Sequence, residues 1–507
     1  MLSTGRRIIM WKEFTITELQ AQMDSGELTA RTLTEKYLER IAQIDQQGPS
    51  LNAVLTVNPE ALEIADVLDA ERKAQGARGP LHGIPVLLKD NLDTADLMPT
   101  TAGSLALAGS IAPGDAFVTE KLRQAGAIIL GKANLSEWAN FRSTHSVSGW
   151  SSLGGQVRHP YALDRNPCGS SSGSAVAVAA NLCAVAIGTE TDGSITCPAS
   201  INGVVGIKPT VGLVSRAGIV PISHSQDTAG PMGRTVADAA TLLGVLTGLD
   251  SRDSATEASV GKSFTDYTQF LQADGLKGAR IGVARNYFGK RPSVDQIMEE
   301  AIEIMQQVGA EIIDPANLET VEQLSEPEME VLLYEFKADL NEYLAQRGPD
   351  APVHSLVEII EFNEQNREQV MPWFGQEIML MAQEKGPLTE EGYRQARAKC
   401  LRLAATEGID AVLAAHKLDA IVAPSNHPAW LTDWVNGDSY SGGSSAMTAV
   451  AGYPNITVPV GFVHGLPVGI SFMGTAYQEP TLIRLAYAFE QATRLRQPPQ
   501  YLPTLFV

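Results

Sequence analysis

The sequence predicts an α/β protein, a single large domain with a mixed central β-sheet covered by helices. Short apolar runs alternate with longer segments of helical periodicity along most of the 507 residues, and this alternation is typical of sheets whose strands are connected by helices. No repeat of about 20–50 residues is visible, which argues against a solenoid or a propeller.

The N-terminal half contains the clearest alternation. A helix is expected to begin at Thr17, and a second one to cover Thr29–Ile44, where apolar residues recur every three or four positions. The next expected elements are a helix opened by Asn58-Pro59-Glu60, a strand at Ile84–Leu88, a helix at Phe117–Gln124, a strand at Ala127–Leu130, a helix at Ser174–Asn181 and a strand at Cys183–Gly188.

The second half continues in the same style. The expected elements are strands at Ile281–Ala284 and Ile421–Ala423, a helix at Val294–Val308, paired strands at Asn455–Val460 and Pro467–Met473, and a last helix at Pro480–Arg494. Residues 320–420 differ, because they are helical in pattern, rich in Glu and Gln, and interrupted at Gly348-Pro349 and Gly386-Pro387. We interpret them as a helical insertion or cap within a single domain of residues 1–507, because no linker separates them.

Composition excludes several classes of partner. The net charge of −20 argues against nucleic acid and anionic membranes. The longest apolar run, Ala175–Gly188, is shorter than the roughly 20 residues of a spanning helix. The N-terminal MLSTGRRIIMWKEFT has no apolar core typical of a signal peptide. We therefore expect a cytoplasmic protein, a monomer or homodimer, that meets small-molecule or peptide ligands.

The four cysteines suggest neither a metal site nor a redox motif. None forms a CxxC pair, and no Cys/His cluster has zinc-finger spacing. We expect Cys168, Cys183, Cys197 and Cys400 to act as small apolar residues in tightly packed places.

The first segment with chemical potential is His82–Asn91, in which Lys89 ends an apolar run that should be a buried strand. Lysine is rarely buried without a purpose, and burial lowers its pKa, so that a neutral amine becomes available as a base. The alternative is a lysine that reaches solvent or pairs with Asp90.

Two further segments are rich in glycine and hydroxyl groups. Cys168–Ser174 precedes an alanine-rich helix, and Gly188–Ser194 follows a strand directly. A loop with free N–H groups that ends in a serine suits a nucleophile beside its own oxyanion hole. The plainer alternatives are a capped helix start and a polar turn.

Two familiar motifs do not fit the glycine-serine loop. Gly169–Gly173 spells G-x-S-x-G, but that nucleophile elbow requires a preceding strand, and Arg165–Cys168 contains a proline. The phosphate-binding loop is also absent, because no lysine follows the glycines.

Together the three segments resemble the amidase signature family. The matching residues are Gly83-Ile84-Pro85 with Lys89-Asp90, Gly169-Ser170-Ser171 with Gly173-Ser174, Asp192-Gly193-Ser194-Ile195, Pro198-Ala199 and Gly206-Ile207-Lys208-Pro209-Thr210, within a resemblance that covers roughly residues 15–495. The resemblance implies the amidase signature fold and amide hydrolysis without a metal or an organic cofactor. It implies Ser194 as nucleophile, Ser170 as a bridging serine on a cis peptide, and Lys89 as base. It also implies an oxyanion hole formed by the N–H groups of Thr191, Asp192, Gly193 and Ser194.

Departures from the commoner family pattern refine the expected substrate. Cys168 and Ser172 stand where glycine is usual, Asp192 replaces a glycine, and Thr196-Cys197 replaces an Arg-x pair. These features resemble the peptide amidase branch, whose members remove the C-terminal amide of peptides.

Other functions remain open at this stage. The chain could be a broad small-molecule amidase, the amidase subunit of a transamidation complex that works with partner proteins and tRNA, or a non-catalytic binding protein. Ser171, Trp138, Phe141 and Tyr440 are candidates for substrate contact, although each could serve packing alone.

Overall fold

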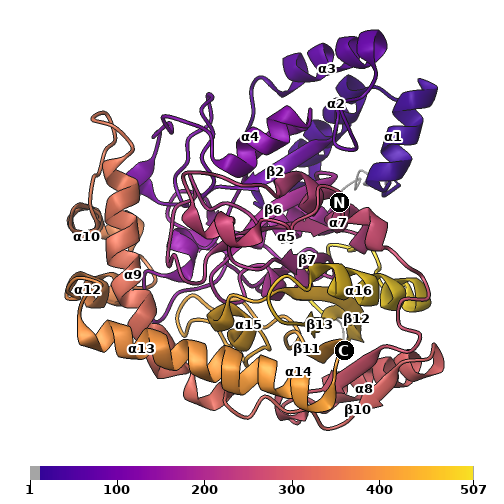
Figure 1. Ribbon diagram of the computed structural model, residues 1–507. Coiled ribbons are helices and arrows are strands. Elements are labelled where there is room, and N and C mark those ends of the chain that lie inside the picture. The colour runs from indigo at the N-terminus through magenta and orange to yellow at the C-terminus, as the bar shows by residue number, and fades with distance from the viewer. Residues whose placement is uncertain (1–11, 506–507) are drawn as a thin grey trace, which may run out of the picture.

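A single mixed sheet runs through the molecule and has helices on both of its faces (Figure 1). The computed structural model describes residues 12–505, and within them eleven strands form this sheet. Their spatial order is β1 (Val54–Val57), β3 (Ile128–Ala133), β2 (Pro85–Lys89), β6 (Val185–Glu190), β8 (Thr228–Gly233), β7 (Val205–Lys208), β12 (Asn455–Val463), β13 (Leu466–Met473), β11 (Ala420–Pro424), β9 (Arg280–Val283) and β10 (Glu311–Ile313).

The sheet is mixed, as the sequence predicts. Strand β2 pairs in parallel with β3 and β6, and β9 pairs in parallel with β10 and β11. The other neighbours are antiparallel. A small antiparallel pair, β4 (Trp150–Ser151) and β5 (Gly155–Gln156), stands apart from it. The predicted α/β class is confirmed.

The helices account for most of the remaining regular structure. They are α1 (Ile16–Ser25), α2 (Ala30–Arg40), α3 (Ala61–Gln75), α4 (Phe117–Gln124), α5 (Ser172–Ala179), α6 (Thr196–Ile201), α7 (Val236–Leu246), α8 (Pro292–Gln307), α9 (Ser325–Ala345), α10 (Leu356–Gln365), α11 (Arg367–Val370), α12 (Glu377–Gln383), α13 (Glu391–Leu401), α14 (Asp410–His416), α15 (Ala446–Ala451) and α16 (Glu479–Thr493). Helix α2 continues into a π-helical segment, Ile41–Asp45, so the predicted helical stretch is helical to its end.

Helices α9 to α14 occupy the segment that the sequence marks as a cap (Figure 1). In Figure 1 they lie along one side and the lower edge of the molecule, in orange tones. Helix α9 is attached through Phe336, whose buried ring meets the ring of Phe141 edge-on with centroids 5.0 Å apart. Helix α9 thereby contacts the segment of Phe141.

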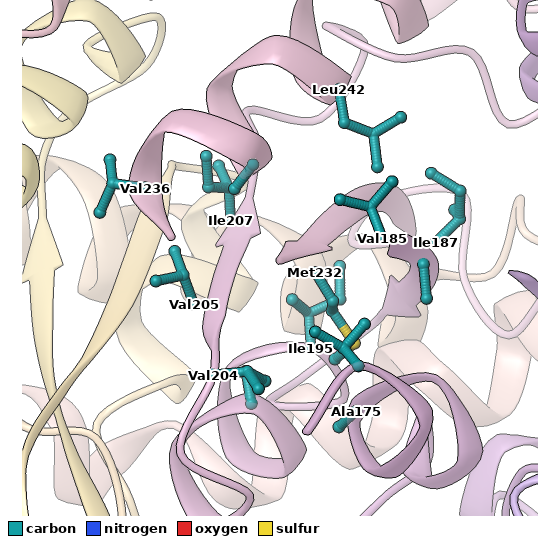
Figure 2. Close-up of a cluster of buried hydrophobic side chains, with 14 of the residues drawn as sticks. Ala175, Val185, Ile187, Ile195, Val204, Val205, Ile207, Met232, Val236 and Leu242 are labelled. Carbon is teal, nitrogen blue, oxygen red and sulfur yellow. The ribbon is translucent and has the colours of Figure 1, made fainter. Parts of the chain in front are cut away.

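The core beneath the site is built from fully buried aliphatic side chains. Figure 2 shows them converging from β6, β7 and β8 onto α7 and onto the start of α6; they include Val185, Ile187, Ile195, Val205, Ile207, Met232, Val236 and Leu242. Burial of each such side chain contributes about 1.5–3 kcal/mol. This packing fixes the ends of the strands that carry polar residues.

The sequence predicts neither a membrane-spanning helix nor a signal peptide, and the structure bears on the first of these expectations. Among the helices of residues 12–505, none combines the length and the apolar character that crossing a bilayer requires. Residues 1–11, which make up most of the segment assessed for a signal peptide, lie outside the described part of the chain.

Candidate active site

The parallel pairing of β2 and β6 brings two polar strand ends together. Leu88 is registered with Ile187, and parallel strands end at the same edge of a sheet. Lys89 at the end of β2 therefore lies beside Thr189 and Glu190 at the end of β6.

Lys89 is fully buried and contacts hydroxyl and carbonyl oxygens. Its Nζ lies 2.7 Å from Oγ of Ser170, 2.8 Å from Oγ1 of Thr189 and 3.2 Å from the carbonyl oxygen of Thr189. Burial lowers the pKa of Lys89 to about 7, although the charges of Asp227 and Glu190 act in the opposite direction. A neutral amine can donate its two N–H groups to Thr189 and direct its lone pair at the hydroxyl proton of Ser170.

Asp90 does not pair with Lys89, which removes the alternative left open by the sequence. Successive residues of a strand point to opposite faces, and Asp90 lies 3.7 Å from Nζ of the buried Lys132 and accepts a hydrogen bond from the hydroxyl of Thr101. Among the residues that the structure describes, no carboxylate lies within ion-pair distance of Lys89.

Ser170 is held by a loop whose serines bind neighbouring backbone. The Gly169–Ser170 peptide is cis, as the resemblance implies. The hydroxyl of Ser171 donates to the carbonyl of Thr189 and accepts from its N–H, over 3.0 and 3.2 Å. The hydroxyls of Ser172 and Ser174 donate to carbonyl oxygens over 2.6 and 2.9 Å. The run of serines therefore positions Ser170 against β6.

The loop from Thr191 to Ser194 is shaped by Glu190. Oε2 of Glu190 accepts hydrogen bonds from the N–H groups of Ile195 and Thr196 over 2.7 and 2.8 Å. Gly193 has a φ of +76°, which favours glycine. In the described chain, the N–H groups of Asp192, Gly193 and Ser194 donate to no carbonyl or side chain. They are available to bind an oxygen of a ligand.

Ser194 lies at the wall of a cavity of about 400 Å³. Phe141 and Tyr440 line this cavity, together with Thr191, Asp192 and Gly193. No hydrogen bond joins the hydroxyls of Ser194 and Ser170 among the described residues.

Ser171 and Trp138, two of the residues expected to contact substrate, are not among the residues that line the cavity. Ser171 is fully buried with its hydroxyl against β6, because its place at the start of α5 turns it toward the sheet. Trp138 is 2% exposed and packs in the core cluster that also contains Phe336.

Comparison with known proteins assigns the family. The sequence model of the amidase family matches residues 32–483 of the chain. The chain belongs to the amidase family.

Among solved structures, the amidase is similar to the native peptide amidase from Stenotrophomonas maltophilia, with a TM-score of 0.92, 52% identity, and coverage of 97% of this chain and 99% of that one. A probable amidase from Arabidopsis thaliana is 42% identical, over 97% of this chain and 92% of its own length. A glutamyl-tRNA(Gln) amidotransferase subunit from Thermoanaerobacter pseudethanolicus is 36% identical, over 96% of this chain and 98% of its own length. The protein is thus an amide-hydrolysing enzyme of the amidase signature type.

The amidase contains a disulfide that the sequence pattern did not predict. Cys168 and Cys197 are bonded, with Cα atoms 6.2 Å apart. Both side chains are buried, as expected of small residues in tightly packed places, but the expectation did not include a bond between them. The two residues are 29 positions apart in sequence, and the fold brings the loop of Cys168 against α6. Cys183 and Cys400 are buried free thiols, as expected. Disulfides persist mainly in oxidising compartments, which the expectation of a cytoplasmic location did not take into account.

Three positioning residues of the amidase carried no motif that would have singled them out for this role. Thr189 accepts from Lys89, and its Oγ1 also accepts from Nδ2 of Asn91 over 3.0 Å. Glu190 organises the following loop. Thr189, Asn91 and Glu190 lie within the segments that resemble the family. Their closeness in sequence to Lys89 and Ser194 is the one feature of the sequence that could have pointed to a positioning role.

Proposed function

We propose that this amidase removes the C-terminal amide of peptides through an acyl-enzyme formed on Ser194, with Ser170 and Lys89 as the proton relay. The observation that carries the proposal is the 2.7 Å approach of Lys89 to Ser170 inside a buried network, directly behind Gly169, which lines the same cavity as Ser194.

The relay begins with a neutral Lys89. A serine hydroxyl is a weak nucleophile without a base. Lys89 takes the proton of Ser170, Ser170 takes the proton of Ser194, and Ser194 Oγ attacks the amide carbonyl. A hydrogen bond between the two serine hydroxyls has to form for this step, and catalytic hydrogen bonds commonly tighten only when the substrate is bound.

The loop after β6 supplies the complementary charge stabilisation. The carbonyl oxygen becomes negative in the tetrahedral intermediate, and the N–H groups of Asp192, Gly193 and Ser194 have no competing acceptor within the described chain. One donor of this kind is worth about 2.7–4 kcal/mol in other enzymes. Ammonia leaves after the relay returns a proton to the amide nitrogen, and water then hydrolyses the acyl-enzyme with the proton transfers reversed.

The choice of peptide amides rests on the cavity and on the relatives. A cavity of about 400 Å³ can hold more than a small acyl group, and the similar Stenotrophomonas enzyme is a peptide amidase. Phe141 and Tyr440 offer aromatic surface to such a substrate.

The test is release of ammonia from amidated dipeptides by the isolated chain, with mass spectrometry for internal cleavage. We expect ammonia and the free-acid peptide in equal amounts, and none from Ser194→Ala. Activity retained by Ser194→Ala would contradict the nucleophile, and turnover of aryl or aliphatic amides alone would contradict the peptide specificity.

A role in transamidation is the second candidate, because an amidotransferase subunit matches nearly the whole chain. A protein with that role would need partner proteins and tRNA. Efficient hydrolysis of a peptide amide by the isolated chain would therefore exclude it.

A further inference from the structure

The described lining of the cavity in front of Ser194 contains three carboxyl side chains, Asp192, Glu328 and Asp438, and no Lys, Arg or His. Asp438 is engaged within the protein, because its two oxygens accept from the indole of Trp430 and the N–H of Ser148 over 3.0 and 2.9 Å. Neither Asp192 nor Glu328 has hydrogen bonds to both of its carboxylate oxygens from the described residues.

Glu328 reaches the cavity from the first turn of α9. It is 8% exposed. Its Oε1 accepts from Nε2 of Gln226 over 3.0 Å, and the same nitrogen lies 3.3 Å from the carbonyl of Thr191. Its Oε2 accepts no hydrogen bond from the described residues. One carboxylate oxygen in a largely buried position is therefore left for a ligand.

Asp192 reaches the same cavity from the loop that ends in Ser194. Its side chain is exposed to the cavity and has the hydroxyl of Ser445 as a hydrogen-bonding neighbour. Burial, and then the charge of Asp192, raises the pKa of Glu328 well above its usual range. Desolvation of its carboxyl group within the cavity, with a smaller contribution from the charge of Glu190, raises the pKa of Asp192 to about 6, while the charge of Lys208 acts in the opposite direction. Two carboxyl groups that line one cavity disfavour each other's charged form, and no Lys, Arg or His lines that cavity with them.

We propose that Asp192 and Glu328 together bind a cationic side chain of the substrate, so that peptide amides ending in arginine are preferred. The inference rests on the proposed function and specifies its substrate class. A guanidinium group is planar and can donate to two carboxylates at once. Met329 and Leu332 line the same cavity and can contact the aliphatic stem.

The positions of Asp192 and Glu328 relative to Ser194 suit recognition of the C-terminal residue of the substrate. Asp192 is two residues from Ser194, a span of at most about 7 Å along the chain. The leaving group of a C-terminal amide is only ammonia, so a side chain that fills the cavity belongs to the acyl part. The carboxylates therefore recognise the residue whose carbonyl Ser194 attacks.

The experiment compares kcat/KM for N-acetyl-glycyl-argininamide and N-acetyl-glycyl-citrullinamide, which have nearly the same shape but differ in charge. The acetyl group leaves the arginine side chain as the only cation. We expect the wild-type enzyme to prefer arginine by about tenfold or more, and Glu328→Gln to bring the ratio of the two kcat/KM values most of the way to one. Asp192→Asn should lower the same ratio.

Glu330→Gln is the matched control. It lies on the same helix and changes the net charge equally, but Glu330 pairs with Nζ of Lys385 at 2.6 Å and does not line the cavity. We expect its arginine-to-citrulline ratio to equal that of the wild type.

Binding measured separately from turnover completes the test. Ser194→Ala, titrated with the two amides by calorimetry, should bind the arginine amide more tightly, and Glu328→Gln in that background should abolish the difference. Equal turnover of both amides by the wild type, or a ratio unchanged by Glu328→Gln, would overturn the inference and leave the proposed function standing. Absence of ammonia from both amides would overturn the proposed function and the inference together.

Discussion

At the scale of single residues, the difference between Lys89 and Lys132 shows what makes a buried lysine a base. Both side chains are fully buried on neighbouring strands. Lys132 has the carboxylate of Asp90 at 3.7 Å, which favours its charged form, whereas Lys89 has only the oxygens of Ser170 and Thr189. A counter-ion would hold Lys89 protonated, so the lack of one within the described chain suits a proton acceptor.

The titration of Lys89 gives the first prediction. Burial lowers its pKa to about 7, and the relay needs the unprotonated amine, so kcat/KM should rise with pH and level off above about 7. Below that value it should fall about tenfold for each pH unit. A pH–rate profile from about pH 5 to about pH 9 on a neutral peptide amide measures this.

The control for this profile is Lys89→Arg, whose side chain stays protonated over the whole range. It should be inactive at every pH although it can occupy a similar volume. A wild-type profile that stayed flat from about pH 5.5 to about pH 8 would contradict the assignment of Lys89 as base.

At the scale of elements, sequence pattern predicts continuous apolar strands and misses strands that consist of small residues. Strands β2 and β6 each contain an apolar run followed by polar residues at the end, and the sequence predicts both strands to within a few residues. Strand β8 reads Thr-Ala-Gly-Pro-Met-Gly and carries two glycines and a proline. At Gly230 a Cβ atom would meet the carbonyl oxygen of Ile207 at 2.1 Å. Such a glycine reflects contact with a neighbouring strand, which local sequence cannot show.

The disulfide gives the second prediction, because it joins two elements of the candidate site. Cys168 precedes the loop of Ser170, and Cys197 lies in α6, three residues after Ser194. For a loop of 29 residues, the chain-entropy treatment gives a stabilisation of about 3–4 kcal/mol. Cys168→Ser should therefore lower the melting temperature by several degrees and reduce kcat.

Reduction of the wild-type protein should reproduce both effects. Cys183→Ser removes a buried free thiol and keeps the disulfide, so its kcat should respond to added thiol as that of the wild type does. Thermal unfolding and turnover with and without dithiothreitol measure these outcomes. Unchanged melting and unchanged kcat on removal of Cys168 would show that the bond does not support the site.

At the scale of the whole molecule, the candidate catalytic residues are predictable from the sequence. Of the two carboxyl groups proposed to bind a cationic side chain, only Asp192 is predictable, and Glu328 is not. Lys89, Ser170 and Ser194 lie in short segments with recognisable spacing. Asp192 stood out as a departure from the family pattern, but Glu328 lies far along the chain in a glutamate-rich helix. Nothing in that helix marks one glutamate among several, and only the tertiary placement of α9 at the cavity of Ser194 selects it.

The net charge of −20 gives the last prediction. A strongly negative protein attracts a cationic substrate over distances comparable with the Debye length, which falls from about 10 Å at 0.1 M salt to about 3 Å at 1 M. The value of kcat/KM for the arginine amide should therefore fall as sodium chloride is added, while that for the citrulline amide should stay nearly constant. Glu328→Gln should lower the arginine value at every salt concentration and leave the slope almost unchanged, because it removes one of 58 acidic residues. Equal slopes for the two substrates would mean that the charge preference arises only after the substrate has entered the cavity.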